Sequence, residues 1–332
     1  MMTAMTSPRR LPALVGLTAT LLTVSLAGCV RLETPAPPAR TASPVTVERD
    51  TLAAALDDVS TALAEGSDGG TLAQVEARSL PSLVDGVGQR YVTYPGVTPS
   101  ASASASASAD PVTLDSVVQA ALDTSVEIAT STDDADLRAW ATSGALVHGM
   151  ALWLGLVDDG SVDTGAAART LPSSDAAESL TVPDSSALDS TTLADLALRH
   201  DQARYLYELV ATRQSGAEKA ASLARAELHA ERSDALQELS GADDARTEVY
   251  STLASSIEDD ASRAATLRDT EDAVASAYAA AAVSSESGDV AWLLDGAFDA
   301  YAAESLLDGW RLTDLPVLPG LADASSAEDT QG

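Results

Sequence analysis

The sequence predicts an all-α protein whose C-terminal part is a four-helix bundle. Apolar residues recur at intervals of three and four over long stretches, which is the spacing of one helix face. The alternating apolar and polar runs that are typical of strands are almost absent. Alanine is abundant along the expected helix seams, where small side chains favour close helix packing.

The first 28 residues have the three parts of a secretory signal peptide. Arg9 and Arg10 form the positive region, and 11–27 is an uncharged, mostly apolar run. The run ends in Leu26-Ala27-Gly28-Cys29, which resembles the lipobox of bacterial lipoproteins. The resemblance implies that the Cys29 thiol receives a diacylglycerol and that a peptidase then cuts before this residue. Two or more acyl chains, palmitate for example, would anchor the protein stably on the outer face of the cell membrane.

Cys29 is the single cysteine of the chain and stands where the lipobox requires a thiol. This position argues against the alternative of an uncleaved signal anchor with an incidental cysteine. The Arg9-Arg10 pair also invites a twin-arginine export signal, but residues 11–13 fit that consensus poorly, so we favour the general secretory route. With its only thiol lipidated, the chain can form no internal disulfide and has no cysteine nucleophile.

The charge balance excludes some partners. Nineteen basic residues stand against 50 acidic ones, and removing Arg9 and Arg10 with the signal changes the net charge from −31 to −33. Nucleic-acid binding needs clusters of Lys and Arg that are absent here. Electrostatic binding to anionic lipids is disfavoured for the same reason. We therefore expect membrane attachment through lipid on Cys29 and, as a possible partner, another protein of the cell envelope.

Segments without apolar periodicity divide the chain. Residues 29–45 are Pro-rich and are expected to form a tether, and the SASASASASA stretch places an Ala/Ser linker at 100–110. Residues 158–190 return to Asp, Ser, Gly, Thr and Pro, which predicts a second linker. The final segment, 313–332, is expected to be a disordered tail.

Helical periodicity fills the remaining segments. Residues 46–99 form an N-terminal helical region, in which a second helix is interrupted or restarts at Pro81 and an extended segment follows. Residues 111–157 show two apolar stripes with a short break and are expected to form a helical hairpin. Residues 191–312 are the most regular part, with short first and third connections that are typical of an up-down bundle. The four helices of this bundle are expected at about 191–213, 217–239, 257–284 and 288–311.

The inner seam of the expected bundle carries one ionisable residue on each helix. Tracing the apolar stripes places His200, Glu231, Glu271 and Glu304 near the middle of their helices. Buried carboxylates are costly unless they are paired or bind a metal ion. One imidazole and three carboxylates could meet at one level of the bundle.

Two interpretations of this cluster are open. A single metal ion could be held by His200 with one or more of the three glutamates. The chain contains no Glu-x-x-His pair, which makes a di-iron site of the ferritin kind improbable. The favoured interpretation is a hydrogen-bonded polar layer in which Arg225, Arg232 or Arg268 neutralises the carboxylates. No cofactor is then required.

The C-terminal stretch resembles a ferritin-like domain of unknown function found in actinobacterial proteins, DUF4439. The resemblance rests on His200 with Tyr205 and Tyr207 in RHDQARYLYELVATR, and on His229 with Arg232 in HAERSDAL. It covers about 120 residues and implies a ferritin-like four-helix fold. The family carries no established activity.

The motifs point to no reaction. His148 lies beside an apolar stripe and is expected to be a packing residue, and none of the three histidines adjoins a serine-nucleophile motif. We therefore expect a non-enzymatic binding or structural bundle of the cell envelope without catalytic residues. The alternative is a metal-binding or redox protein that uses the His200 cluster. A solute-binding lipoprotein is disfavoured, because that class needs two α/β lobes and strand signals are missing.

Overall fold

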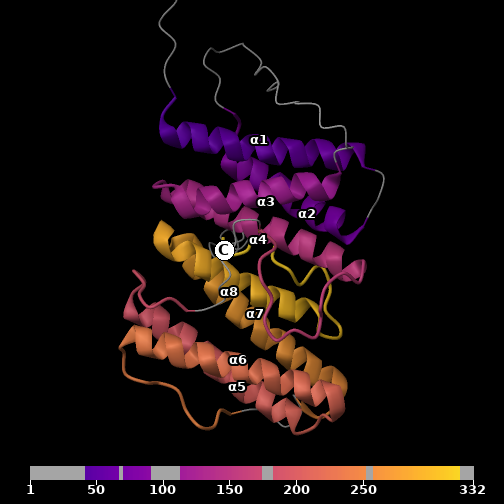
Figure 1. Cartoon of the computed structure of the whole chain (residues 1–332), viewed down its shortest axis with the longest axis vertical. Coiled ribbons are helices and arrows are strands. Elements are labelled where there is room, and N and C mark those ends of the chain that lie inside the picture. Colours follow the sequence, from indigo (N-terminus) through magenta and orange to yellow (C-terminus); the bar gives the residue numbers. More distant parts are fainter. Residues whose placement is uncertain (1–41, 67–69, 91–112, 174–181, 252–256, 322–332) are drawn as a thin grey trace, which may run out of the picture. The chain divides into compact units, whose positions relative to one another are not determined.

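The computed structural model describes residues 42–66, 70–90, 113–173, 182–251 and 257–321. Every regular element in these ranges is helical and none is a strand, which confirms the prediction of an all-α protein. The helices of the described residues, labelled in Figure 1, are α1 (Pro44–Glu65), α2 (Thr71–Val87), α3 (Leu114–Ser131), α4 (Ala135–Asp158), α5 (Ser190–Ala211), α6 (Gly216–Ser240), α7 (Asp260–Ser284) and α8 (Ser287–Ser305).

Polar caps fix where several helices begin. The Ser43 side chain accepts a hydrogen bond from the first turn of α1. Reciprocal capping boxes begin α3, with Thr113 and Ser116, and α7, with Asp259 and Ser262. Each box pairs backbone N–H groups that the helix itself leaves without partners.

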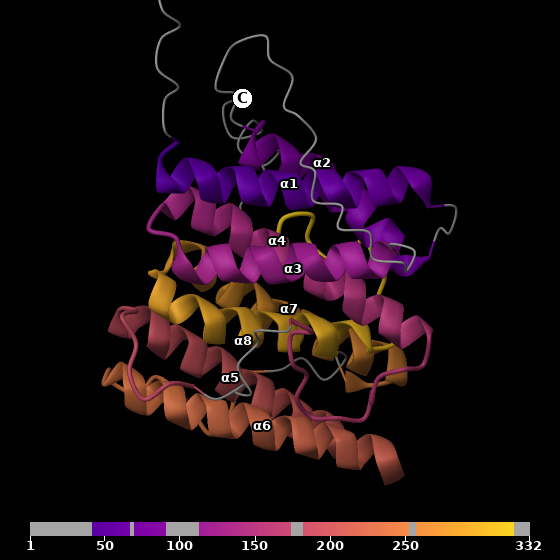
Figure 2. The same ribbon diagram turned by 45° about the horizontal axis from the view of Figure 1, so that its top comes forward.

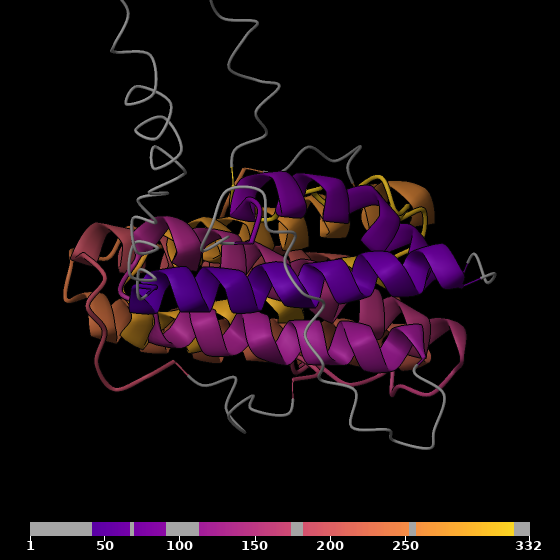
Figure 3. The same ribbon diagram turned by 90° about the horizontal axis from the view of Figure 1, so that it is seen from above.

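Helices α1 to α4 close a ring around an aliphatic core. Helix α1 packs against α2 and α3, and α4 packs against the same two helices. In the view from above, α1 lies along α3 with α2 on its other side (Figure 3). Leucines of these four helices are among the largest side chains that the protein buries completely: Leu52, Leu56, Leu83, Leu122, Leu137 and Leu146.

Helices α5 to α8 form two hairpins. Helix α5 pairs with α6, α7 pairs with α8, and α5 lies against α7. The α7–α8 hairpin also packs against α4, and α8 against α3, so it lies between the α5–α6 and α3–α4 pairs (Figures 1 and 2). Gly296 allows the close approach of α8 to α7, because a Cβ there would lie 2.4 Å from the Tyr278 ring.

Helix α4 is the centre of the described structure. Its Arg138 donates to the carbonyl of Ser285 at the end of α7 (2.8 Å) and to that of Thr132 (2.9 Å). Among the described helices, α4 is the one long and apolar enough to cross a membrane, but 78% of its most apolar window is buried inside the protein. It is therefore a buried core helix, against which α2, α3, α7 and α8 pack.

Two sequence expectations are wrong. Helix α2 runs through Pro81 without interruption. Pro81 and Ala77 are both exposed, so water can reach the carbonyl that the proline leaves without an N–H partner. The described part of the expected disordered tail, 313–321, lies against the protein instead, with Leu315 only 2% exposed. The Arg78 guanidinium also donates to the Leu312 carbonyl (2.6 Å) just before this segment.

Several other expectations fall outside the described residues. They concern the signal peptide, Cys29, the tether up to residue 41, the extended segment at 91–99, the 100–110 linker and the last part of the tail, 322–332.

Candidate functional site

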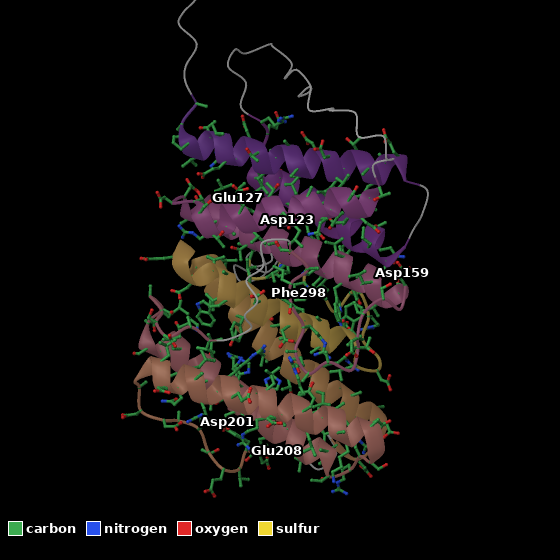
Figure 4. The ribbon with its side chains drawn as sticks, in the orientation of Figure 1. Asp123, Glu127, Asp159, Asp201, Glu208 and Phe298 are labelled. Atoms are coloured by element: carbon green, nitrogen blue, oxygen red, sulfur yellow. The ribbon has the colours of Figure 1, made fainter. Side chains whose placement is uncertain are left out.

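Buried polar side chains gather between α5, α6, α7 and α8, in a region we call the polar layer. Nitrogen and oxygen atoms crowd below the labelled Phe298, toward the helix pair that carries Asp201 and Glu208 (Figure 4). All members of the polar layer are at most 5% exposed. They are His200 and Tyr207 on α5, Arg225, His229 and Arg232 on α6, Glu271 and Tyr278 on α7, and Asp299 on α8.

The two histidines form a chain of hydrogen bonds. His200 Nδ1 lies 2.8 Å from His229 Nδ1, and His200 Nε2 lies 2.8 Å from the Tyr278 hydroxyl. His229 Nε2 lies 3.3 Å from Glu271 Oε1. Burial lowers the pKa of both imidazoles. A proton on His229 would lower the pKa of His200 further, whereas the charge on Glu271 opposes the effect of burial on the pKa of His229.

These contacts assign the protons of the chain. Glu271 can only accept when ionised, so His229 Nε2–H donates to it and His229 Nδ1 is left as an acceptor. His200 Nδ1–H then donates to His229, and the Tyr278 hydroxyl donates to His200 Nε2. Both histidines are neutral in this arrangement and hold opposite tautomers.

Arg225 joins three helices through its guanidinium group. Its Nε donates to Glu271 Oε1 (2.8 Å) and its Nη2 to Glu271 Oε2 (2.7 Å), a two-bond pairing of planar groups. Its Nη1 donates to Asp299 Oδ2 (2.7 Å). Burial would lower the pKa of Arg225, but Asp299 and then Glu271 outweigh it and hold the pKa well above the ordinary value.

The charges within the polar layer balance. Arg232 Nη1 donates to Asp299 Oδ2 (2.6 Å), so two arginines face two carboxylates. Burial would raise the pKa of both carboxylates, but Arg225 outweighs it, assisted by His229 at Glu271 and by Arg232 at Asp299. Both carboxylates are therefore ionised at neutral pH. The Tyr207 hydroxyl adds a further hydrogen bond to Glu271 Oε1 (2.7 Å).

The segment before α5 also contributes to the polar layer. The Ala167 carbonyl accepts from Arg225 Nη1 (2.8 Å), and the Arg169 backbone N–H donates to Asp299 Oδ1 (2.7 Å). Leu171 is buried beside Gly149 of α4. Ala167 and Arg169, in the described part of the expected 158–190 linker, thus contribute hydrogen bonds to the layer that the aperiodic sequence did not predict.

The polar layer contains only two of the four residues expected on the inner seam. His200 and Glu271 belong to it and are connected through His229. Glu231 is exposed, because α6 turns Arg225, His229 and Arg232 inward. The predicted inner face of α6 followed its alanines, which occur on exposed helix faces as well as on buried ones. The prediction therefore assigned the wrong face of α6 to the core.

Glu304 is buried near the end of α8, but among the described residues it forms no ion pair with Arg225 or Arg232, and Asp299 takes the place expected for it. Its Oε2 has no hydrogen-bond partner among the residues that the structure describes. Burial, and then the charges on Asp272 and Asp314, raise its pKa to about 8. On the same helix, burial raises the pKa of Asp295 to about 7, against the opposing charge of Arg232.

The side chains of the polar layer do not fit a metal ion. No group of three or more His, Cys, Asp or Glu side chains could hold one among the residues that the structure describes. His200 and His229 use all four of their ring nitrogens in the hydrogen-bond chain, and Arg225 occupies both oxygens of Glu271. Arg225 neutralises Glu271, as the favoured interpretation expected for that residue, whereas Arg232 pairs with Asp299, which was not among the expected carboxylates. Arg268, the third candidate, donates to the Asp308 carbonyl instead.

No family model matches the chain, and no curated protein or solved structure matches it at a significant level.

Replacing Arg225 by methionine is expected to destabilise the protein strongly. The change keeps an aliphatic stem but removes the guanidinium group that pairs with Glu271 and leaves Arg232 as the ion-pair partner of Asp299. Breaking a buried ion pair from one side typically costs about 3–5 kcal/mol. Urea unfolding followed by circular dichroism measures the loss. The control is Arg311→Met, which removes a 75% exposed partner of Asp314 and should cost less than about 1 kcal/mol. Equal losses for the two variants would contradict the assigned role of Arg225.

Replacing Glu304 by glutamine is expected to stabilise the protein in a pH-dependent way. With a folded pKa of about 8 and an ordinary value of 4.5, ionisation of Glu304 opposes folding increasingly as the pH rises between these values. The gain in unfolding free energy should therefore be absent near pH 4.5, grow toward pH 8 and then level off, with a slope of at most about 1.4 kcal/mol per pH unit. Exposed Glu231→Gln is the control and should show no such growth. A gain that does not change with pH would refute the assigned protonation.

Proposed function

We propose that the chain is a lipid-anchored lipoprotein of the extracytoplasmic membrane face, whose helical body is a non-enzymatic binding or structural module of the cell envelope. The observation that carries the proposal is the run Leu26-Ala27-Gly28-Cys29 at the end of an uncharged apolar segment that follows Arg9 and Arg10. Lipid on Cys29 would attach the body that begins with α1 to the membrane surface.

The chemistry of the polar layer supports a non-enzymatic role. A catalytic acid, base or nucleophile must reach its substrate through space or through a bound water. The imidazole nitrogens and carboxylate oxygens of the layer are instead engaged with one another, at sites 5% exposed or less. Their balanced charges favour a role in holding α5 to α8 together.

We further propose that α5 to α8 form a ferritin-like bundle related to the DUF4439 domains. Two helical hairpins with inward polar groups on every helix support this assignment. Where a ferritin-like bundle would bind metal, this bundle would have the polar layer, in which arginines neutralise the carboxylates. The bundle would then act as a packed helical body that binds a partner.

Metabolic labelling with a radioactive fatty acid tests the anchor in a bacterial host that processes lipoproteins. The native chain should carry the label and lose residues 1–28, because the lipobox directs both steps. Cys29→Ala should lose the label and keep the precursor mass. Ser25→Ala, a change of similar size inside the apolar run, is the control and should remain labelled. Label on the Cys29→Ala chain, or a mature N-terminus at another residue, would rule the anchor out.

A further inference from the structure

A groove runs between α1 and α3, which lie along each other (Figure 3). Its cavity volume is about 1130 Å³, and it is lined by residues 51–66 at the end of α1, by residues 113–124 at the start of α3 and by the start of α2. Leu72 and Ala121 form its floor, since they are only 8% and 1% exposed. The groove is therefore a cleft with a buried apolar floor rather than a flat helix surface.

The walls of the groove carry mainly small side chains. Five alanines contribute to the lining: Ala54, Ala55, Ala62, Ala73 and Ala120. The distance between two packed helices depends on the side chains at their contact, so small residues let a further helix come close. Residues 51–65 extend along the groove for about 21 Å, at about 1.5 Å per helical residue. The groove thus has the length and the lining of a site for a helix.

The charged residues that line the groove are all acidic. They are Asp58 and Glu65 on α1 and Asp115 on α3, and all three are exposed. Among the described residues, none of the three forms a salt bridge. No lysine or arginine stands among the described residues of the lining. The groove therefore offers negative charge that the described part of the protein leaves uncompensated.

Two of these acids lie at the same end of the groove. The Thr132 hydroxyl, just after α3, donates to Glu48 near the start of α1 (2.6 Å). The two helices are therefore antiparallel, and the end of α1 with Glu65 lies beside the start of α3 with Asp115. The negative charge is thus concentrated toward one end of the groove, which would fix the direction of a bound helix.

We propose that the groove between α1 and α3 binds one helix of a partner protein, which places small or apolar side chains on the floor and Lys or Arg beside the three carboxylates. An amphipathic helix in a groove is a common mode of peptide recognition. Complementary charge speeds the encounter and fixes the register. The proposal rests on the binding role proposed above for the helical body and names the chemistry of its partner.

Other occupants fit the groove less well. A second copy of the chain would bring a strongly negative net charge and the same carboxylates, which would repel each other. Anionic lipid head groups would meet the same repulsion. An extended peptide would need the free edge of a sheet, and the described residues contain no strand. A drug-sized molecule would leave part of the groove empty, because such sites usually measure about 300–1,000 Å³.

Fluorescence anisotropy tests the groove in the full chain, solubilised in detergent. The probe is a dye-labelled synthetic helical peptide of about 15 residues, the length of the groove. It has alanine and leucine on one face and a lysine for each groove carboxylate near one end. A second peptide differs only in having glutamate in place of each lysine. The native chain should bind the lysine peptide, more weakly as salt is added, and should not bind the glutamate peptide.

Charge variants test whether the groove carboxylates attract the lysines. The neutral variant combines Asp58→Asn, Glu65→Gln and Asp115→Asn. It should bind the lysine peptide about tenfold more weakly, because each exposed ion pair contributes modestly. The control removes the same number of exposed charges from α6, through Glu218→Gln, Glu227→Gln and Glu231→Gln. Its affinity should stay close to that of the native chain, since both variants have the same net charge.

A pair of tryptophan variants tests whether the peptide occupies the groove itself. Ala120→Trp fills the groove from α3 and should abolish binding, whereas Ala64→Trp, on α1 outside the lining, should not. Both alanines are exposed, so both variants should keep the native circular dichroism spectrum.

Three results would overturn the proposal: no binding of the lysine peptide, equal loss in the two charge variants, or full binding by Ala120→Trp. A native dimer that Ala120→Trp dissociates, measured by sedimentation, would assign the groove to a second copy and would also contradict it. None of these results touches fatty-acid labelling at Cys29, so a failure here is distinguishable from a failure of the proposed anchor.

Discussion

The pairing of Arg225 with Glu271 and Asp299 is the interaction on which the arrangement of α5 to α8 depends. Ions of this kind lose several kcal/mol of hydration when they are buried, and they regain it only with well-formed hydrogen bonds and balanced charge. The guanidinium group meets both needs, since its three nitrogens reach Glu271 on α7 and Asp299 on α8 from one residue of α6. Arg232 also pairs with Asp299, so the polar layer contains two guanidinium groups and two carboxylates.

The same pairing determines the chemistry of its neighbours. Because Arg225 keeps Glu271 ionised, Glu271 orients His229, and His229 orients His200. A proton added to either imidazole would sit in a buried layer whose charges are already balanced. The layer is therefore a closed network among the described residues, and this supports the proposed role of its ion pairs in holding α5 to α8 together.

Helix positions were predictable from the sequence, whereas side-chain partners were largely not. The periodicity over 111–157 and 191–312 gave hairpins close to the observed helices, because apolar spacing reports directly on which face is buried. The phase of α6 was not predictable, since its inward face carries two arginines and a histidine, residue types that are mostly exposed. Asp299 and the 167–171 segment were missed because their roles arise from contacts between residues far apart in the chain. The lipobox at Cys29 is local, so the sequence supports that proposal without a structure.

The nitrogen chemical shifts of the His200 and His229 rings test the closed network most directly. The account predicts mainly neutral rings at pH 6.5, where an ordinary histidine is half protonated, with the hydrogen on Nδ1 of His200 and on Nε2 of His229, unchanged when a divalent transition metal is added. Half-protonated rings at this pH, or signals that shift with stoichiometric metal, would show that the layer is open to protons or ligands and would contradict the account.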